Sequence, residues 1–155
     1  MSDRDAVARF VERFAAALTD AGMPRMPARV FVTLLATDSG RLTAAELAER
    51  LHSSAGAISG AVRYLNQTQL VDRERVPGSR KEHYRVRDDV WHVATARRDD
   101  YLRRWATALD DGIAAVGPDT PAGARLAETQ EFFAFMQKEM PALVERWQEY
   151  RSRGG

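Results

Sequence analysis

Residues 42–71, LTAAELAERLHSSAGAISGAVRYLNQTQLV, and residues 72–86, DRERVPGSRKEHYRV, decide the fold of this chain. The first stretch carries Thr43 and, three residues later, Glu46, which is the spacing of a capping box. In such a box the hydroxyl and the carboxylate satisfy the first backbone N–H groups of a helix. We therefore predict a short helix that begins after Thr43 and ends near Leu51.

A second helix is predicted over residues 55–67, after a turn at residues 52–54. Two short helices joined by such a turn form a helix-turn-helix. At about 100° per residue, the apolar side chains of the second helix gather on one side, and its two glycines lie nearly opposite. The apolar side comprises Ile58, Ala61, Val62 and Leu65, and the opposite side comprises Gly56, Gly60, Arg63 and Gln67.

The two glycines of the outward side, Gly56 and Gly60, indicate that this face approaches a large surface closely. Each glycine costs about 1 kcal/mol relative to alanine inside a helix. A helix that only had to fold would not carry both on one face. The DNA major groove is one such surface, and short side chains let a helix enter it deeply. Packing of neighbouring protein against the glycines is the alternative.

Residues 70–76 and 81–87 are predicted to be two strands, because apolar and charged side chains alternate along them. A Pro-Gly-Ser turn joins them, and Arg80 and Lys81 follow that turn at the tip of the hairpin. A β-hairpin directly after a helix-turn-helix makes a winged helix, and a cation at the tip of the wing can enter the minor groove. The predicted fold class is mainly α with a small β-hairpin wing, a winged helix-turn-helix with flanking dimerisation helices.

Residues 42–86 resemble the DNA-binding segment of the MarR family of bacterial transcriptional regulators. The preceding GMPRMPARVFVTLL, residues 22–35, resembles the GbsR-like branch of that family. The resemblance implies a homodimer whose recognition helices enter successive major grooves of double-stranded DNA. One departure is Gln69, which stands where related chains usually carry a glycine that ends the recognition helix.

The resemblance also implies which residues contact DNA. It assigns base reading to Ser53, Ser54, Ala57, Ser59 and Arg63, and wing contacts to Arg80 and Lys81. We add Gly60 on the outward face, and we add Arg73 and Arg75 as contacts to the phosphate backbone or the minor groove.

Both flanks of the winged helix, residues 1–27 and 88–155, are predicted to be mainly helical, because apolar residues recur along them at helical spacing. The last helix begins after Thr120, and we expect Pro141 to kink or break it. This is more apolar helix than a small winged helix can cover, so pairing with a second copy is the economical solution. Burial within a single chain is the alternative.

The chain is thus predicted to be one compact domain, in which residues 28–87 bind DNA and the two flanks dimerise. A twofold dimer predicts a pseudo-palindromic DNA site with half-sites about 10 bp apart, or a multiple of that distance.

Four side chains of the helix after the wing are candidates for an effector pocket. Arg98 lies within an apolar stripe, and because an unpaired buried charge is costly it needs either an acid across the dimer or an anionic ligand. Trp91, Tyr101 and Trp105 share that stripe. They would line a small-molecule pocket or else belong to the core.

The positive charge of the chain is concentrated in its middle. Residues 41–87 carry nine basic and five acidic side chains, whereas residues 88–155 carry nine basic and twelve acidic side chains. The formal net charge of the whole chain is only +1. A local basic surface of this kind indicates a polyanionic partner.

The sequence carries no catalytic motif. There is no P-loop, no GxGxxG and no GxSxG. His52, His83 and His92 fall on separate predicted elements without the spacing of metal ligands. The absence of cysteine excludes disulfides and thiolate nucleophiles. We therefore expect a protein that is not an enzyme and that uses no metal and no cofactor.

These features predict a sequence-specific regulator of transcription that binds double-stranded DNA as a dimeric repressor and is relieved by a small-molecule effector. The alternative is a winged-helix module that docks on another protein without contacting DNA. No apolar run reaches the length of a membrane span, and MSDRDAVARF lacks the apolar core of a signal peptide. We therefore expect a cytoplasmic bacterial protein with no membrane partner, associated with the nucleoid when bound.

Overall fold

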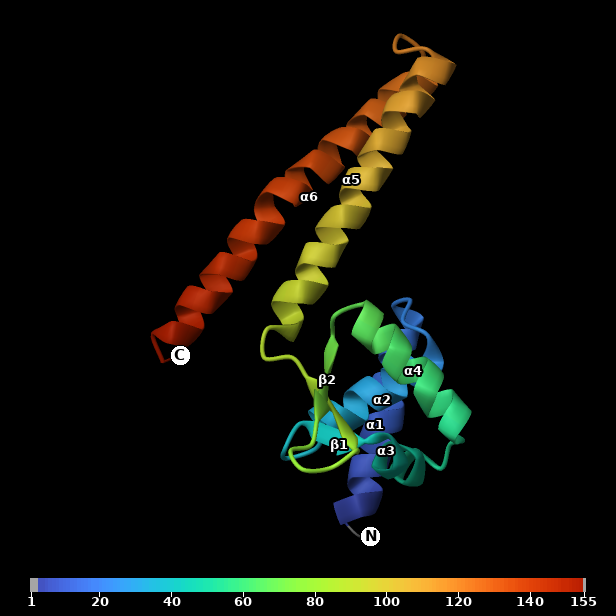
Figure 1. Ribbon diagram of the computed structural model, residues 1–155. Helices are drawn as coiled ribbons and strands as arrows, with labels where there is room; N and C mark the ends of the chain where they lie inside the picture. The colour runs from blue at the N-terminus through green and yellow to red at the C-terminus, as the bar shows by residue number, and fades with distance from the viewer. Residues whose placement is uncertain (1–2, 155) are drawn as a thin grey trace. The chain divides into compact units, whose positions relative to one another are not determined.

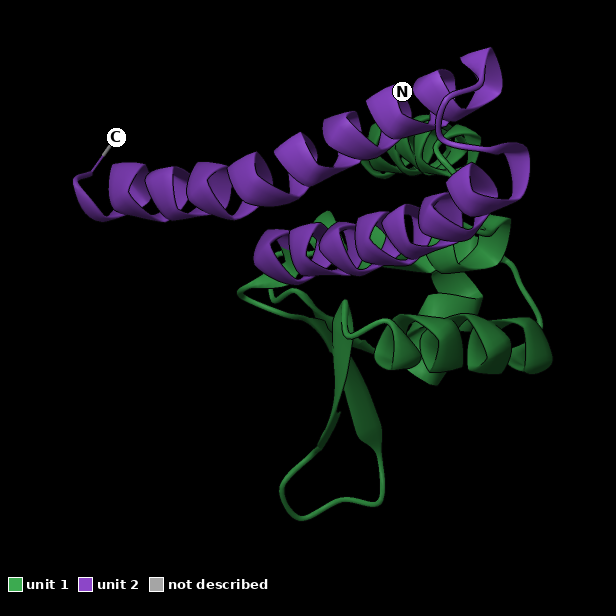
Figure 2. Cartoon of the chain, turned by 90° about the horizontal axis from the view of Figure 1, so that it is seen from above, with its two compact units in different colours: residues 1–90 green, residues 91–155 purple. Residues whose placement is uncertain are grey.

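The computed structural model describes residues 3–154 and divides the chain into two compact units, residues 1–90 and residues 91–155 (Figure 2). The order of helices and strands can be followed by colour in Figure 1. The elements are α1 (Asp3–Asp20), α2 (Arg25–Leu35), β1 (Arg41–Thr43), α3 (Ala44–Leu51), α4 (Ala55–Gln67), β2 (Val71–Arg75), β3 (Glu82–Val86), α5 (Val90–Val116) and α6 (Pro121–Ser152).

The helix-turn-helix forms where the sequence predicts it, as α3 and α4. The Thr43 hydroxyl accepts from the Glu46 N–H at 3.2 Å, and a Glu46 carboxylate oxygen accepts from the Thr43 N–H at 3.1 Å. The bond from the Thr43 N–H, followed by a side-chain hydrogen bond from Thr43, lowers the pKa of Glu46, because both favour the charged form of its carboxylate. α4 begins at its own cap, where the Ser54 hydroxyl accepts from the Ala57 N–H at 3.1 Å.

The end of α4 shows what replaces the glycine that the family resemblance leads one to expect. Gln69 has a φ of +60°, which is the left-handed conformation that glycine adopts without cost. The Gln69 N–H donates to the Asn66 carbonyl and the Leu70 N–H donates to the Leu65 carbonyl, each at 3.0 Å. The chain therefore makes the glycine-type helix end with a glutamine.

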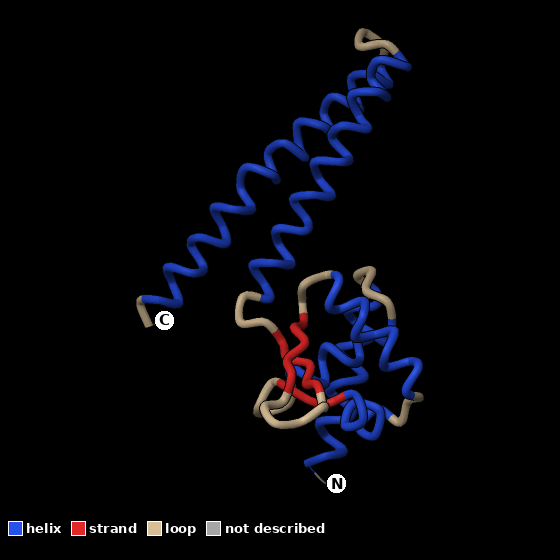
Figure 3. The backbone as a smooth tube through the Cα atoms, in the orientation of Figure 1, coloured by secondary structure: helices blue, strands red, loops and turns tan. Residues whose placement is uncertain are grey.

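The wing is part of a three-stranded antiparallel sheet with the order β1-β3-β2 (Figure 3). Residues 70–76 and 81–87 form β2 and β3 as predicted, with slightly shorter bounds. The strand β1 was not predicted. Its central residue, Leu42, pairs with Tyr84 of β3, and both side chains are buried.

The core of the first unit forms around α2. This helix buries four large apolar side chains, and α1, α3 and α4 all pack against it. The apolar side predicted for α4 is buried as expected. Among the largest fully buried side chains are Val30, Phe31, Val32 and Leu34 of α2, Leu47 of α3, and Ile58 and Leu65 of α4.

The second unit is a hairpin of the antiparallel helices α5 and α6. Its turn depends on Thr120, whose hydroxyl donates to the Gly117 carbonyl at 2.7 Å and accepts from the Gly123 N–H at 3.0 Å. Gly123 is buried, and an added Cβ atom would collide with the Gly117 carbonyl. Only glycine fits at this position.

Pro141 does not break the last helix, because α6 continues as an α-helix through it to Ser152. The kink, which was the other expectation for Pro141, stays a prediction. Proline lacks the N–H that would bond to the carbonyl four residues earlier, so it removes one hydrogen bond from the ladder. The remaining bonds of a helix of 32 residues are enough to carry the helix past this point.

Residues 1–90 and residues 91–155 form the two units of the structure. α1 packs against α2 and belongs to the first unit, although the sequence grouped it with the C-terminal helices. The assignment of residues 28–87 to DNA binding, and of residues 1–27 and 88–155 to dimerisation, stays a prediction.

Candidate nucleic-acid interface

The outward side of α4 is open. Gly56, Gly60 and Arg63 are all exposed, and a Cβ atom built on either glycine would meet no atom of a neighbouring element within 4 Å. The apolar side of the helix fixes it to the core, so the outward side is presented as a rigid surface. Within the described residues, nothing in the first unit packs on these glycines, which removes the alternative explanation of their presence for this unit.

The three serines predicted to read bases differ in how their hydroxyls are used. The Ser53 hydroxyl donates to the Leu51 carbonyl at 3.2 Å and accepts from Arg29 at 3.3 Å. The Ser54 hydroxyl caps α4. Ser59 is exposed, and its hydroxyl has no bond to any residue that the structure describes. Of the three, Ser59 is therefore the hydroxyl that is available to a ligand, while Ala57 beside them is half-buried.

The basic side chains of the wing fall into two groups. Arg73 pairs with Glu82 at 3.4 Å and lies over the ring of Tyr84, 5.9 Å from its centre. Arg75, Arg80 and Lys81 form the second group: like Arg63 on α4, they are exposed and have no acidic partner among the residues that the structure describes.

A network of ion pairs at the base of the wing was missed by the sequence analysis. Arg85 of β3 donates to Glu74 of β2 at 2.7 Å and also contacts Asp88, which raises the pKa of the Arg85 guanidinium. Arg87 joins Asp72 of β2 to Asp89. Alternating charges on the two strands could have indicated this pairing.

Arg29 of α2 was also missed. Its guanidinium reaches α1 and the turn between α3 and α4, and its side chain is only 15% exposed. The available signal was one arginine within the apolar run of residues 28–35.

The predicted effector residues lie on α5 in the second unit. Trp91, Arg98, Tyr101 and Trp105 are exposed in the single chain, so the charge of Arg98 is solvated there. Trp105 contacts Phe133 of α6, with ring centres 5.6 Å apart. These positions give no enclosed site within the second unit, and the effector pocket stays a prediction.

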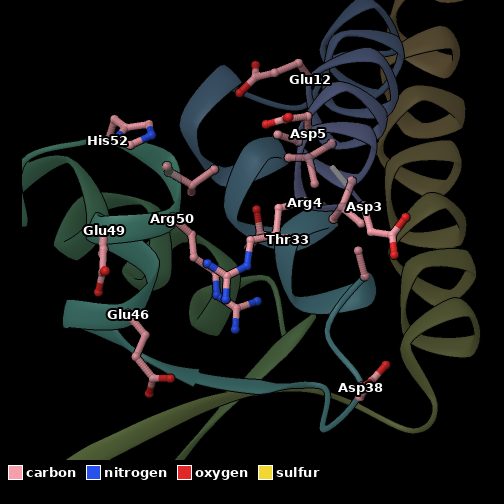
Figure 4. A pocket seen from close by; sticks show the side chains of 15 residues that line it. Asp3, Arg4, Asp5, Glu12, Thr33, Asp38, Glu46, Glu49, Arg50 and His52 are labelled. Atoms are coloured by element: carbon pink, nitrogen blue, oxygen red, sulfur yellow. The ribbon is translucent and has the colours of Figure 1, made fainter. Parts of the chain in front are cut away.

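The larger of the two pockets described lies in the first unit, with a volume of about 740 Å³ (Figure 4). Its walls come from α1, from α2 and the loop after it, and from α3 with His52. The labelled carboxylates come from α1, from α3 and, with Asp38, from the loop after α2, and the two arginines are Arg4 and Arg50. None of the four predicted effector residues lines this pocket.

Two features are absent from residues 3–154. No three His, Asp or Glu side chains of this part of the chain lie where they could share a metal ion. No helix of the same part has the length and apolar character that crossing a membrane requires.

Two family models match the chain, one in each unit. The model described as MarR family matches residues 21–82, and the model described as MmpR5-like MarR family transcriptional regulator matches residues 89–150. Together they cover the winged helix as far as the start of β3, and most of the helical hairpin.

Individual proteins and solved structures are also similar to this chain. The HTH-type transcriptional regulator MmpR5 of Mycobacterium tuberculosis is 27% identical over 142 residues, which is 91% of this chain and 86% of the relative. A crystal structure described as a transcriptional regulator is 26% identical, with a TM-score of 0.79 over 93% of this chain and 99% of the other. Sco3205 of Streptomyces coelicolor, a MarR family regulator solved in complex with DNA, is 21% identical, with a TM-score of 0.45 over 94% and 80% of the two chains.

The proteins matched are described as regulators of transcription rather than as enzymes. The winged helix, the two family models and a relative that aligns along nearly the whole chain agree: both units of this protein are similar to the MarR family of transcriptional regulators.

Proposed function

We propose that the chain regulates transcription by binding double-stranded DNA in a sequence-specific manner, with α4 in the major groove. The observation that carries this proposal is the open outward side of α4, where two glycines leave the helix backbone accessible next to Arg63. A helix with this surface can approach base edges closely, and an arginine can read guanine with two hydrogen bonds.

The roles of the predicted contact residues follow from how free their side chains are. Arg63 and Ser59 have no partner among the described residues and are proposed to read bases, with Ala57 and Gly60 allowing close approach. Ser53 and Ser54 shape the start of the helix. The proposed contacts to phosphate or the minor groove are Arg75, Arg80 and Lys81, with Arg73 contributing less because Glu82 already pairs with it.

The protein is proposed to act as a homodimer. In the second unit, between residues 91 and 154, only Leu102 and Gly123 are buried. One face of α6 exposes large apolar side chains, each at least half accessible, which are Phe132, Phe135, Leu143, Trp147 and Tyr150. A two-helix hairpin cannot cover such a face by itself, and a second copy of the same face can. A twofold pair would then read a pseudo-palindromic site.

We further propose that the protein represses transcription and that a small-molecule effector relieves this repression. The proposed effector site lies near Trp91, Arg98, Tyr101 and Trp105. We also propose that the chain belongs to the GbsR-like branch. The branch rests on the sequence of residues 22–35 alone. An effector that favours one arrangement of the dimer would shift the population able to bind DNA.

The experiment that tests the function is a selection of bound duplexes from a random pool, followed by affinity measurements across salt concentrations. We expect a preferred sequence and an affinity that falls steeply with salt, because neutralised phosphates release counterions. If no duplex is enriched and random DNA is not bound at low salt, DNA binding is excluded and docking on another protein becomes the better explanation.

A further inference from the structure

Arg29 joins three elements of the first unit through one guanidinium group. Its Nη2 and Nε atoms lie 2.8 and 2.9 Å from one carboxylate oxygen of Glu12 on α1. Its Nη2 also donates to the Leu51 carbonyl at 3.2 Å, and its Nη1 donates to the Ser53 hydroxyl at 3.3 Å. The side chain is 15% exposed, so water does little to replace these bonds.

The two bonds on the far side of Arg29 act on the turn that precedes α4. Leu51 is the last residue of α3, where backbone carbonyls have no partner within the helix. Arg29 and the Ser53 hydroxyl both donate to the Leu51 carbonyl. His52 lies between Leu51 and Ser53, and its φ of +49° is unfavourable for any residue other than glycine. The turn is therefore held in a costly conformation by its own hydrogen bonds to the end of α3 and, from outside the turn, by Arg29.

We propose that Arg29, oriented by Glu12, is a positioning residue that sets the direction in which α4 leaves this turn and so determines which DNA sequence α4 reads. Ser54, the cap of α4, follows Ser53 directly, so a shift of the turn moves the first turn of the recognition helix. Arg29 itself is packed between helices and does not belong to the outward side of α4. This inference rests on the proposed function.

Lysine cannot substitute for arginine in this role. The guanidinium presents its donors in a rigid fork, whereas a lysine has a single ammonium group on a flexible stem. Arg29→Lys therefore keeps the charge of the chain, and with it the general attraction to DNA, while losing the simultaneous bonds to Glu12, Leu51 and Ser53. Arg25→Lys is the matched control, because Arg25 is exposed on the same helix and has no partner among residues 3–154.

Glu12→Ala is a second test variant. For this variant, the proposal and the change in net charge predict opposite effects on the affinity for the selected duplex. Removing an acidic group makes the chain more positive, which by itself tightens binding to any duplex. If Glu12 orients Arg29, the affinity for the selected sequence falls instead. Glu49→Ala is the matched control, because Glu49 is an exposed acid of α3 without a partner among the described residues.

The measurement is the dissociation constant of each variant for the selected duplex and for a random duplex, at one salt concentration. For Arg29→Lys we expect the ratio of the dissociation constant for the random duplex to that for the selected duplex to fall about tenfold, the worth of one good base contact. For Glu12→Ala we expect a smaller fall in the same direction. Arg25→Lys and Glu49→Ala should leave the ratio unchanged. Circular dichroism confirms that each variant is folded, and Glu12→Ala carries the test if Arg29→Lys is not.

An unchanged ratio in the folded variants overturns the proposal, and so does an equal loss of affinity for both duplexes, which would mean that Arg29 only stabilises the fold. If the unaltered protein binds neither duplex, the proposed function fails first and this inference fails with it. These results are distinguishable because the unaltered protein is measured in the same experiment.

Discussion

Arg73 of β2 pairs with Glu82 of β3, with 3.4 Å between the Arg73 Nε atom and a carboxylate oxygen. Arg75 lies two residues further along β2, opposite Glu82 in the strand register, and has no acidic partner within the described chain. Two arginines on one face of the wing therefore differ in how freely they can meet a phosphate.

This difference predicts unequal effects in DNA binding. Arg75→Ala should weaken binding to all duplexes and lower the slope of log affinity against log salt by about 1, as expected for one lost phosphate contact. Arg73→Ala should have a smaller effect, because its charge is already partly neutralised. Fluorescence anisotropy at several salt concentrations measures both. Equal effects of the two substitutions would contradict the claim that the ion pair with Glu82 makes Arg73 less available to phosphate than Arg75.

A second prediction separates base reading from general attraction. Arg63→Ala should cost about 1–3 kcal/mol on the selected duplex, which is the range for a good base contact, and relax the sequence preference. Arg80→Ala should weaken selected and random duplexes alike. Gel-shift titrations of both variants with both duplexes decide this. Unchanged affinity in both variants would remove these residues from the interface.

A third prediction concerns pH and the capping box of α3. The pKa of Glu46 is lowered from its ordinary value of 4.5, chiefly by the bond from the Thr43 N–H. A carboxylate with a lowered pKa in the folded state stabilises the protein above its unfolded pKa, and this contribution is lost as the pH falls through the folded pKa. The unfolding free energy should therefore decrease as the pH drops below 4.5.

Denaturation with urea at a series of pH values measures this contribution. The Glu46→Gln variant should be less stable at neutral pH, and the difference from the unaltered protein should shrink in acid. A difference that is the same at every pH would show that the capping bonds do not depend on the charge of Glu46.

A fourth prediction concerns the turn between α5 and α6. Gly123→Ala should destabilise the helical hairpin by several kcal/mol, because the new methyl group collides with the Gly117 backbone and the turn must open. Ala122→Gly is a useful comparison, because it should cost only about 1 kcal/mol of helix propensity. Thermal unfolding followed by circular dichroism compares them. Equal stability of the two variants would contradict the tight turn.

The sequence predicted the elements whose signals are local. The capping box at Thr43, the apolar side of α4 and the alternation along β2 and β3 each depend on residues close together in the chain, and all three appear in the structure. β1 was missed because three residues are too short to show a period, and its pairing partner lies about 40 residues later. Arg29 was missed for a similar reason, since its partners come from α1 and the α3–α4 turn.

At two further positions the structure differs from what the local sequence predicts, because the surrounding structure outweighs the preference of a single residue. Gln69 takes a left-handed conformation that sequence statistics reserve for glycine, because the end of α4 and the start of β2 require it. Pro141 lies within a long helix that continues on both sides of it. In both cases a single unfavourable residue costs less than rearranging its neighbours.

The central claim, that α4 enters a groove through its open side, is tested most directly by Gly60→Gln. The substitution adds a longer uncharged side chain where the structure has room, and glutamine forms helix better than glycine, so the free energy of unfolding should rise by up to about 1 kcal/mol. The affinity for the selected duplex should nevertheless fall at least about tenfold, because the side chain occupies the space that the bases need. A more stable variant that binds the selected duplex as tightly as the unaltered protein would contradict the account.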